Sequence, residues 1–366
     1  MELDDSRKPL TIDSIAPLGD FELEVSNGFV NRTQHPDLPY EIWNYSKKTQ
    51  FDRHWNPITK VCRGLITNSL TGEIVARPFP KFFNAGEDDI PIPWAEPIVV
   101  TEKVDGSLGI VYPDLAGGLQ IATRGSFASD QALHATGLLR ERYGDFAPPA
   151  DWTFLFEIVY PENRIVINYE GLDDLILLGA VEKDTGRSVS LAAAASYWSG
   201  PVATVYPFKS FAEIDRNRIP ENREGFVVHF QDSDLRLKVK SDWYFNMHRL
   251  MTGTSPKTIW ENLVVGLEVE EVFRDVPGDF REWALGVASH LRTEHARVTE
   301  QVETEYAKLC AELGGNFMRK EFAARAAQSP WRGYLFAKLD GKDISPMVWR
   351  NLKPKSEMAF VPDAEA

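Results

Sequence analysis

Short apolar runs separated by turn residues dominate the chain between about residues 60 and 250. Runs of this length, rich in β-branched and aromatic residues and bounded by Gly, Pro, Asn and Asp, are typical of β-strands. We predict strands at residues 63–67, 99–102, 108–112, 119–123, 152–160, 175–181, 225–230 and 235–239. Two helical patches interrupt them, at residues 190–198 and 211–216. This pattern predicts an α+β domain with mostly antiparallel sheets.

The pattern changes to a helical period after about residue 250. From Arg281 to Leu313 apolar residues recur at steps of three, four and seven, which marks one face of a long helix. A pair of glycines at 314–315 ends this helix, and Ser345-Pro346 begins a short one. We therefore divide the chain into an antiparallel-sheet domain, residues 1–252, and an all-α C-terminal domain, residues 253–366.

Composition excludes several classes of protein. With 366 residues and 43% apolar content, the chain can build cores in two domains. It has no apolar run of membrane-spanning length and no signal-peptide pattern, so we expect no membrane association. Cys62 and Cys310 lack metal-ligand spacing, which favours free thiols in a cytoplasmic protein. A net charge of −14 argues against non-specific coating of nucleic acid but leaves a local cationic groove open.

Lysines beside the predicted strands are the first candidates for chemistry. Lys103 begins the sequence K-V-D-G-S between two apolar runs, where a pocket could hold its amine; the alternative is a hairpin in which Asp-Gly is only a turn. Arg236, Lys238 and Lys240 alternate along one predicted strand and therefore share a face. Three cations on one face repel each other unless an anion covers them; the alternative is a solvated strand face.

Two acids and two further cations join these lysines. Glu157 lies in the middle of an apolar strand and Glu224 at the start of another. A carboxylate in such a place is costly unless it binds a cation, a metal or a ligand hydroxyl. Arg63 and Lys81 lie just upstream of Lys103 and add positive charge.

The order of the motifs K-x-D-G-S, F-E, E-G-F-V and K-V-K resembles that of covalent nucleotidyltransferases, which include ATP-dependent ligases and mRNA capping enzymes. The upstream R-G-L and R-P-F-P-K-F-F-N, the segment P-E-N-R-I-V and the run K-S-D-W-Y narrow the resemblance. They are similar to the phage-type RNA ligase 1 family, whose members reseal broken tRNA anticodon loops. The resemblance covers roughly residues 60–250 and implies that residues 1–252 form an adenylyltransferase domain.

The resemblance implies that Lys103 takes AMP from ATP, and elementary chemistry sets a condition on this step. Only the neutral amine attacks phosphorus, and at a pKa of about 10.4 well under a thousandth is neutral at pH 7. We expect Lys238, Lys240 and a bound Mg²⁺ or Mn²⁺ to lower the pKa of Lys103. The resemblance also implies that Lys238 and Lys240 contact the α-phosphate. Asp105 would orient Lys103 or the nucleotide, and Gly106 would let the backbone approach the nucleotide.

The resemblance assigns the remaining phosphates to other cations. Arg63 and Lys81 would bind the β- and γ-phosphates of ATP and expel pyrophosphate. Arg124 stands where the family usually has lysine, and it can still bind phosphate through its planar fork.

The resemblance assigns the metal and the ribose to acids. Glu157 would touch the ribose or a hydrated metal, and Glu224 would hold the metal and the ribose region. Glu270 and Glu271 would match an acidic pair that reaches a second hydrated metal; the alternative is a solvated helix face.

The implied reaction has three steps. Lys103 takes AMP, AMP passes to the 5′-phosphate of a broken single-stranded RNA, and a 3′-hydroxyl then displaces AMP. The resemblance further suggests a monomer, selection of a tRNA anticodon loop by residues 253–366, and an end-healing kinase-phosphatase as a partner.

Two alternatives stay open. One is another covalent nucleotidyltransferase, either a DNA ligase or a capping guanylyltransferase. These usually carry a β-barrel oligonucleotide-binding (OB) domain after the last lysine motif, whereas the pattern here predicts helices and no OB domain. The other is a non-catalytic RNA-binding protein of the same fold.

Overall fold

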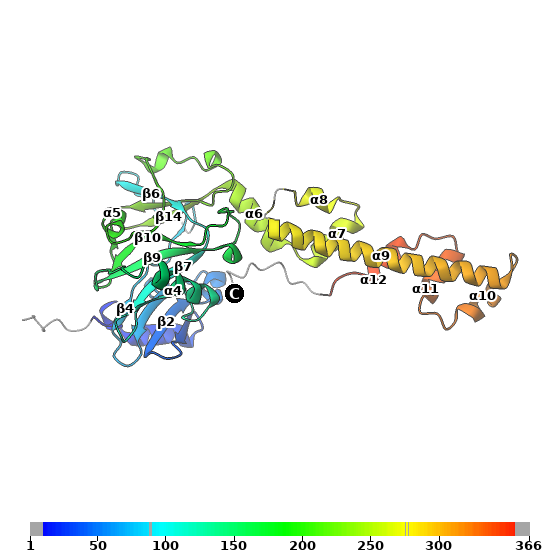
Figure 1. Ribbon diagram of the computed structural model, residues 1–366, viewed down its shortest axis with the longest axis horizontal. Coiled ribbons are helices and arrows are strands. Elements are labelled where there is room, and N and C mark those ends of the chain that lie inside the picture. Colours follow the sequence, from blue (N-terminus) through cyan, green and yellow to red (C-terminus); the bar gives the residue numbers. More distant parts are fainter. Residues whose placement is uncertain (1–9, 88–89, 275, 277, 356–366) are drawn as a thin grey trace, which may run out of the picture. The chain divides into compact units, whose positions relative to one another are not determined.

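The computed structural model describes residues 10–87, 90–274, 276 and 278–355, without the side chain of residue 279. The chain divides into two compact units, and the division falls after Asn246, within helix α6 (Asp242–Gly253). The first unit contains three β-sheets, and the described part of the second is helical (Figure 1). The predicted class, α+β with antiparallel sheets followed by a helical region, is confirmed.

The first sheet lies where the sequence pattern is mixed, and most of it was not predicted. Its four strands are antiparallel in the order β1-β2-β3-β4: β1 (Val30–Gln34), β2 (Tyr40–Tyr45), β3 (Arg63–Asn68) and β4 (Ile74–Ala76). Helices α1 (Leu18–Ser26), α2 (Lys47–Asp52) and α3 (Pro57–Val61) accompany it, with a 3₁₀ turn η1 (Ile12–Ser14). The edge strand β1 exposes four of its five residues, so it lacks the apolar alternation that marks a strand.

The second sheet forms the centre of the first unit. Its order is β11-β10-β9-β7-β8, with β7 (Ser107–Pro113), β8 (Leu119–Ala122), β9 (Trp152–Val159), β10 (Asp174–Glu182) and β11 (Ser188–Val189). A 3₁₀ turn η2 (Pro161–Asn163) follows β9. Helices α4 (Asp130–Arg142) and α5 (Leu191–Ala195) contribute to the apolar cluster on one face. The opposite face shares a second cluster with strands of the first sheet.

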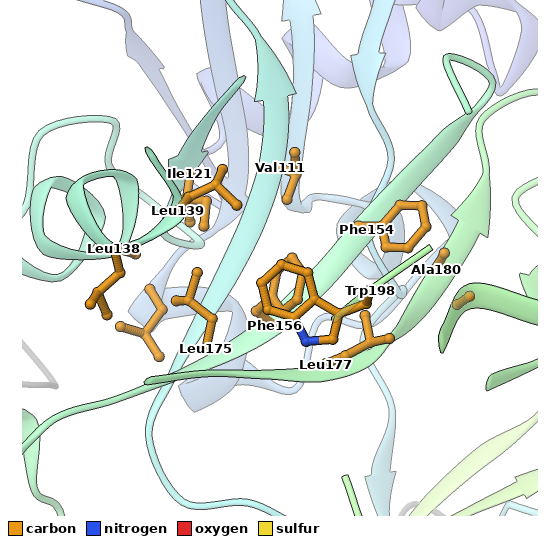
Figure 2. Close-up of a cluster of buried hydrophobic side chains, with 13 residues drawn as sticks. Val111, Ile121, Leu138, Leu139, Phe154, Phe156, Leu175, Leu177, Ala180 and Trp198 are labelled. Carbon is orange, nitrogen blue, oxygen red and sulfur yellow. The ribbon is translucent and has the colours of Figure 1, made fainter. Parts of the chain in front are cut away.

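Aromatic residues fill the cluster between the second sheet and its helices. Figure 2 shows Trp198 beside Phe156 of β9, and their ring centroids are 4.5 Å apart. Leu138 and Leu139 of α4 contribute to the same cluster, and Phe156 is fully buried in it. Helix α4 was not predicted, because its buried positions include two alanines that give little apolar signal.

The third sheet has the order β12-β6-β13-β14-β5: β5 (Phe83–Asn84), β6 (Ile98–Lys103), β12 (Val205–Tyr206), β13 (Gly225–Phe230) and β14 (Arg236–Lys240). Only the pair of β14 with β5 is parallel. The alternating residues on one face are apolar and buried: Val100, Phe226, Val228, Phe230, Leu237 and Val239. Two 3₁₀ turns, η3 (Phe211–Glu213) and η4 (Arg216–Arg218), stand where one helical patch was predicted.

The second unit is built around one long helix. Helix α9 (Gly278–Leu313) packs against α7 (Pro256–Val264), α8 (Val269–Val272), α10 (Arg319–Ala326), α11 (Arg332–Leu339) and α12 (Ser345–Asn351) (Figure 1). As predicted, Gly314 ends α9; its φ is +72°, a left-handed conformation that suits glycine. Across the described residues, no helix combines the length and apolarity needed to span a membrane.

Truncating Phe156 to alanine should destabilise the first unit, because a fully buried aromatic side chain leaves a cavity in this cluster. We expect Phe156→Ala to lower the free energy of unfolding by about 3–5 kcal/mol. Urea denaturation of the full chain measures this loss. Leu133→Ala is the matched control, since Leu133 lies on α4 but is 59% exposed, and it should change stability by less than about 0.5 kcal/mol. Equal effects of the two variants would contradict this account of the core.

Candidate active site

Lys103 lies at the junction between two sheets. It ends β6, and after residues 104–106 the chain enters β7. Strand β6 pairs with β12 and β13 in the third sheet, whereas β7 pairs with β8 and β9 in the second. The hairpin alternative is therefore wrong, because the Asp-Gly turn carries the chain from one sheet to another.

Three neighbouring strands bring two of the predicted lysines together. Lys103 of β6 is opposite Gly225 of β13, which is in turn opposite Lys240 of β14. Residues directly opposite one another share a face of the sheet, so the two lysines flank a position without a side chain. Glycine is required at this position. Its φ is +148°, and a Cβ here would lie 2.0 Å from the carbonyl oxygen of Val239.

A buried carboxylate joins the two lysines. Glu224 precedes β13 and is only 3% exposed. Its Oε2 accepts a hydrogen bond from Lys103 Nζ at 2.6 Å, and its Oε1 lies 3.1 Å from Lys240 Nζ. A buried ionised carboxylate needs partners of opposite charge, and here both of its oxygens have one. Glu224 therefore fixes the distance between the two amines.

Asp105 holds the loop that carries Lys103. It is 4% exposed, and its Oδ2 accepts hydrogen bonds from the backbone N–H groups of Val166 at 2.8 Å and Ile167 at 2.9 Å. Its Oδ1 accepts a hydrogen bond from the hydroxyl of Tyr244 at 2.8 Å, and its backbone N–H donates to the Tyr169 hydroxyl at 2.7 Å. The carboxylate thus ties the Lys103 loop to the segment after β9 and to the start of α6.

Gly106 is required by the neighbouring strand. A Cβ at this position would lie 2.6 Å from the carbonyl oxygen of Ile158 and 3.0 Å from the Cγ of Glu157. The loop therefore passes directly over β9, which brings Glu157 close to the turn. This close approach is a structural reason for glycine that holds without any nucleotide.

Aromatic rings surround the ammonium of Lys81. Its Nζ lies 4.9 Å from the ring centroids of Trp55 and Phe83 and 5.8 Å from that of Tyr45. The rings of Tyr45 and Trp55 also contact each other edge to face, with centroids 5.0 Å apart. Ring faces attract a cation without neutralising it, so this charge is held in place and stays available. Burial lowers the pKa of Lys81.

Two arginines lie beside the same tyrosine. Arg124 donates a hydrogen bond from Nη1 to the Tyr45 hydroxyl at 2.7 Å, and its guanidinium lies 4.9 Å from the centre of that ring. Arg63 donates to the carbonyl oxygen of Phe79 at 3.3 Å. Burial lowers the pKa of the Arg63 guanidinium, and the positive charge of Arg124 lowers it further. Arg63, Lys81 and Arg124 therefore form one group of cations around Tyr45.

The third predicted lysine, Lys238, has no carboxylate partner among the described residues. It shares a face of β14 with Lys240, and its Nζ lies 4.8 Å from the ring centre of Phe82. Burial lowers the pKa of Lys238 well below its usual value, and the charges of Lys103 and Arg63 lower it further. Arg236 is different, because Asp234 pairs with it at 3.3 Å. Of the three cations on this strand face, Lys238 is therefore the one for which a bound anion is expected.

The expected direction of the Lys103 pKa is wrong for the protein by itself. Burial alone would lower this pKa, but the carboxylates of Glu224, Glu157 and Asp105 together raise it above its ordinary value. The nearby cations are visible in the sequence, but the convergence of three acids on the same amine is not. Lys103 therefore rests as an ammonium paired with Glu224.

Among the described residues, Glu157 is the acid of this group without a hydrogen-bond or ion-pair partner. It projects from β9 toward Lys103. Burial raises the pKa of Glu157 to about 7, and the charges of Glu224 and Asp105 add to this effect while Lys103 opposes it. Near neutral pH this carboxyl is thus ready to gain or lose a proton.

Glu270 and Glu271 lie on α8 in the second unit. Arg292 binds Glu270 through both guanidinium nitrogens, one of them at 3.1 Å, and Arg274 pairs with Glu271. No cluster of three or more metal-ligating side chains occurs in the part of the chain that the structure describes. A role for these two acids in binding a second metal stays a prediction.

Sequence reasoning missed three aromatic residues of the site. Tyr45 and Trp55 belong to segments without a clear pattern, and Tyr169 lies in the loop between β9 and β10. Their importance arises from contacts with Arg124, Lys81 and the backbone of residue 105, all distant in the sequence. A short-range pattern carries no signal for such contacts.

Comparison with known proteins finds relatives that are described as RNA ligases. A 29% identical relative over 275 residues is described as a candidate RNA ligase of Thermovibrio ammonificans, and the match covers 68% of this chain and 69% of that protein. A protein of Autographa californica nuclear polyhedrosis virus, described as a candidate bifunctional polynucleotide kinase/RNA ligase, is 30% identical over 66% of this chain and 38% of its own length. RNA ligase 1 of bacteriophage TS2126 is 30% identical over 53% of each chain.

The family profile described as RNA ligase, of the phage T4 RNA ligase 1 type, matches residues 61–249, which is more than half of the chain. The matched segment contains every cation of the site and the three acids that surround Lys103. The chain therefore belongs to the phage-type RNA ligase family.

Proposed function

We propose that this chain joins RNA ends with ATP, through AMP bound covalently to Lys103. The observation that carries the proposal is the row of Lys103, Gly225 and Lys240 across three strands, with Glu224 bridging the two amines. A half-buried lysine, next to a base and to a group of cations that can bind phosphates, is suited to attack on a nucleotide phosphate. A non-catalytic RNA-binding protein has no need for such a lysine.

In the first step, Lys103 must lose a proton before it attacks. Glu224 Oε2, at 2.6 Å from Nζ, is the nearest base and accepts that proton. The nitrogen lone pair then forms a P–N bond to the α-phosphorus of ATP, while the bond to the bridging oxygen breaks and pyrophosphate leaves. Lys240 and Lys238, on the same sheet face, stabilise the charge that grows on the α-phosphate oxygens.

The cations around Tyr45 suit the other two phosphates. Among the described residues, Arg63, Lys81 and Arg124 contact aromatic rings and carbonyl or hydroxyl oxygens and form no ion pair with a carboxylate. An anion that binds there therefore displaces no ion pair that the described residues form. Phosphate binding should also raise the pKa of Lys238, so that this group is charged when ATP is bound.

A divalent metal fits this site through Glu157. Mg²⁺ and Mn²⁺ take oxygen ligands, and Mg²⁺ is usually held by one or two carboxylates together with substrate phosphates and water. Glu157 offers the carboxylate that no protein group occupies, whereas Asp105 and Glu224 are already engaged. The metal would supply charge neutralisation on the phosphates.

The second and third steps use the same phosphate site. AMP passes from Lys103 to a 5′-phosphate of RNA, and a 3′-hydroxyl then attacks that end and releases AMP. The relative that joins kinase and ligase in its name supports an end-healing enzyme that prepares such ends for this chain. We further propose a cytoplasmic monomer that repairs broken tRNA anticodon loops, with residues 253–366 selecting the RNA.

Replacing Lys103 should abolish transfer of label from ATP to the protein. We expect no labelled protein with Lys103→Ala or with Lys103→Arg when ATP carries the label on its α-phosphate. The arginine variant is the sharper one, because it keeps a cation beside Glu224 but remains protonated and cannot attack. Gel electrophoresis of the labelled chain measures the transfer. A label on the arginine variant would move the nucleophile to another residue, and an unlabelled wild type would remove the enzymatic function.

The free energy of unfolding should depend on pH through Glu157. A carboxyl whose pKa is higher in the folded than in the unfolded chain stabilises the fold at low pH, and this contribution is lost as the pH rises through about 7. Between pH 5 and 8 the wild type should lose roughly 2–3 kcal/mol that Glu157→Gln does not lose. Urea denaturation at both pH values measures the difference. The exposed Glu300→Gln is the control and should follow the wild type.

The substrate can be tested directly by competition between nucleic acids. We expect faster sealing of single-stranded RNA with 5′-phosphate and 3′-hydroxyl ends than of nicked duplex DNA. The measurement is the initial rate of joining with each substrate at equal concentration. Faster sealing of the nicked DNA would contradict the RNA assignment while leaving Lys103 as the nucleophile. A label from GTP but not from ATP would instead indicate a capping-type enzyme.

A further inference from the structure

Phe51 is exposed to water although its segment is firmly held. It lies on α2 and is 90% exposed, the largest fraction for any bulky apolar side chain in the described residues. Isolated exposed apolar residues are common, so exposure by itself does not identify a function. Phe51 differs from other exposed apolar residues because its segment begins and ends at the site.

The segment that carries Phe51 is anchored at the phosphate-binding group at both of its ends. Tyr45 precedes the segment and Trp55 follows it, and both rings contact the ammonium of Lys81. The six residues of α2 span only about 9 Å. Phe51 therefore lies on a short segment whose two ends are both at the site, and its side chain is open to solvent.

Contacts with the start of β1 make this segment rigid. The Ser46 hydroxyl donates a hydrogen bond to the carbonyl oxygen of Gly28 at 2.7 Å, and the fully buried Thr49 hydroxyl donates to that of Phe29. The ring of His54 stacks on Phe29 with centroids 3.8 Å apart, and its Nε2 lies 3.0 Å from a carboxylate oxygen of Glu24. Because Thr49 points inward, the opposite side of α2 is fixed toward solvent.

The outward side of α2 combines the aromatic ring with positive charge. Lys47 and Lys48 precede Phe51 by four and three residues, so all three share one helix face. Lys48 is engaged with the carbonyl oxygen of Asn27 at 2.9 Å, whereas Lys47 is exposed and has no partner among the described residues. The other exposed residues of α2, Gln50 and Asp52, are polar, so Phe51 is the one exposed apolar residue of this described helix.

We propose that Phe51 stacks on a base of the RNA strand whose end lies in the site. This inference rests on the proposed function, and it adds a substrate-binding residue outside the ATP group. A rigid aromatic ring next to a free cation is the arrangement by which proteins hold single-stranded nucleic acid, with a base on the ring and a phosphate on the cation. The segment of this ring ends at the cations that are proposed to bind phosphates. We therefore expect the stacked base to belong to a nucleotide near the RNA end that is joined.

The test compares RNA binding with adenylate transfer in the full chain. Phe51→Ala should weaken binding of a single-stranded RNA with a 5′-phosphate about tenfold, as expected for the loss of one stacked base. Phe51→Trp should bind within about twofold of the wild type, because it keeps a stacking surface. Label transfer from ATP to Lys103 should be unchanged in both. Leu70→Ala is the control. Leu70 is 82% exposed and lies in the turn after β3, whereas Arg63 is at the opposite end of that strand.

An RNA with one abasic nucleotide, moved stepwise from the end, identifies the stacked base. In the wild type one position should reduce affinity about tenfold, and at that position the abasic change should have no effect on Phe51→Ala. Equal RNA affinity of the alanine variant and the wild type would overturn the inference, as would a parallel loss of label transfer. An unlabelled wild type would instead disprove the proposed function.

Discussion

The site depends on one buried carboxylate between two amines. Glu224 is almost inaccessible, and Lys103 and Lys240 each contact one of its two oxygens. The arrangement needs a position without a side chain between the lysines, which Gly225 provides on the middle strand. It also needs a fixed turn after Lys103, which the hydrogen bonds of Asp105 provide. Packing, backbone conformation and charge thus act on the same few residues.

Around this pair the charges are not balanced by protein groups. Lys238 is half-buried among other cations, and desolvation together with their repulsion keeps its pKa low. Glu157 is half-buried near other acids, and desolvation together with their charges raises its pKa to about 7. A bound nucleotide would raise the pKa of Lys238, since phosphates favour the charged lysine. A bound metal would lower the pKa of Glu157, since a cation favours the charged carboxylate. Such unpaired buried charges are typical of functional sites rather than of structural ion pairs.

The arginine at position 124, where the resemblance to the family predicts a lysine, has a local explanation. Its guanidinium donates to the hydroxyl of Tyr45 and lies over the same ring, so arginine gains a planar contact that lysine would make less well. That ring also contacts the ammonium of Lys81. The substitution therefore keeps a cation in the group and fixes it through an aromatic partner.

The sequence by itself determined the strands predicted at residues 225–230 and 235–239, the long helix α9, and the alternation that places Lys238 and Lys240 on one face. These features depend on local periodicity, which is written in neighbouring residues. Only the tertiary structure decided that β6 and β7 belong to different sheets, that the first sheet exists, and that acids outweigh cations at Lys103. Strand pairing and electrostatic balance are set by residues far apart in the chain, and a local pattern does not contain them.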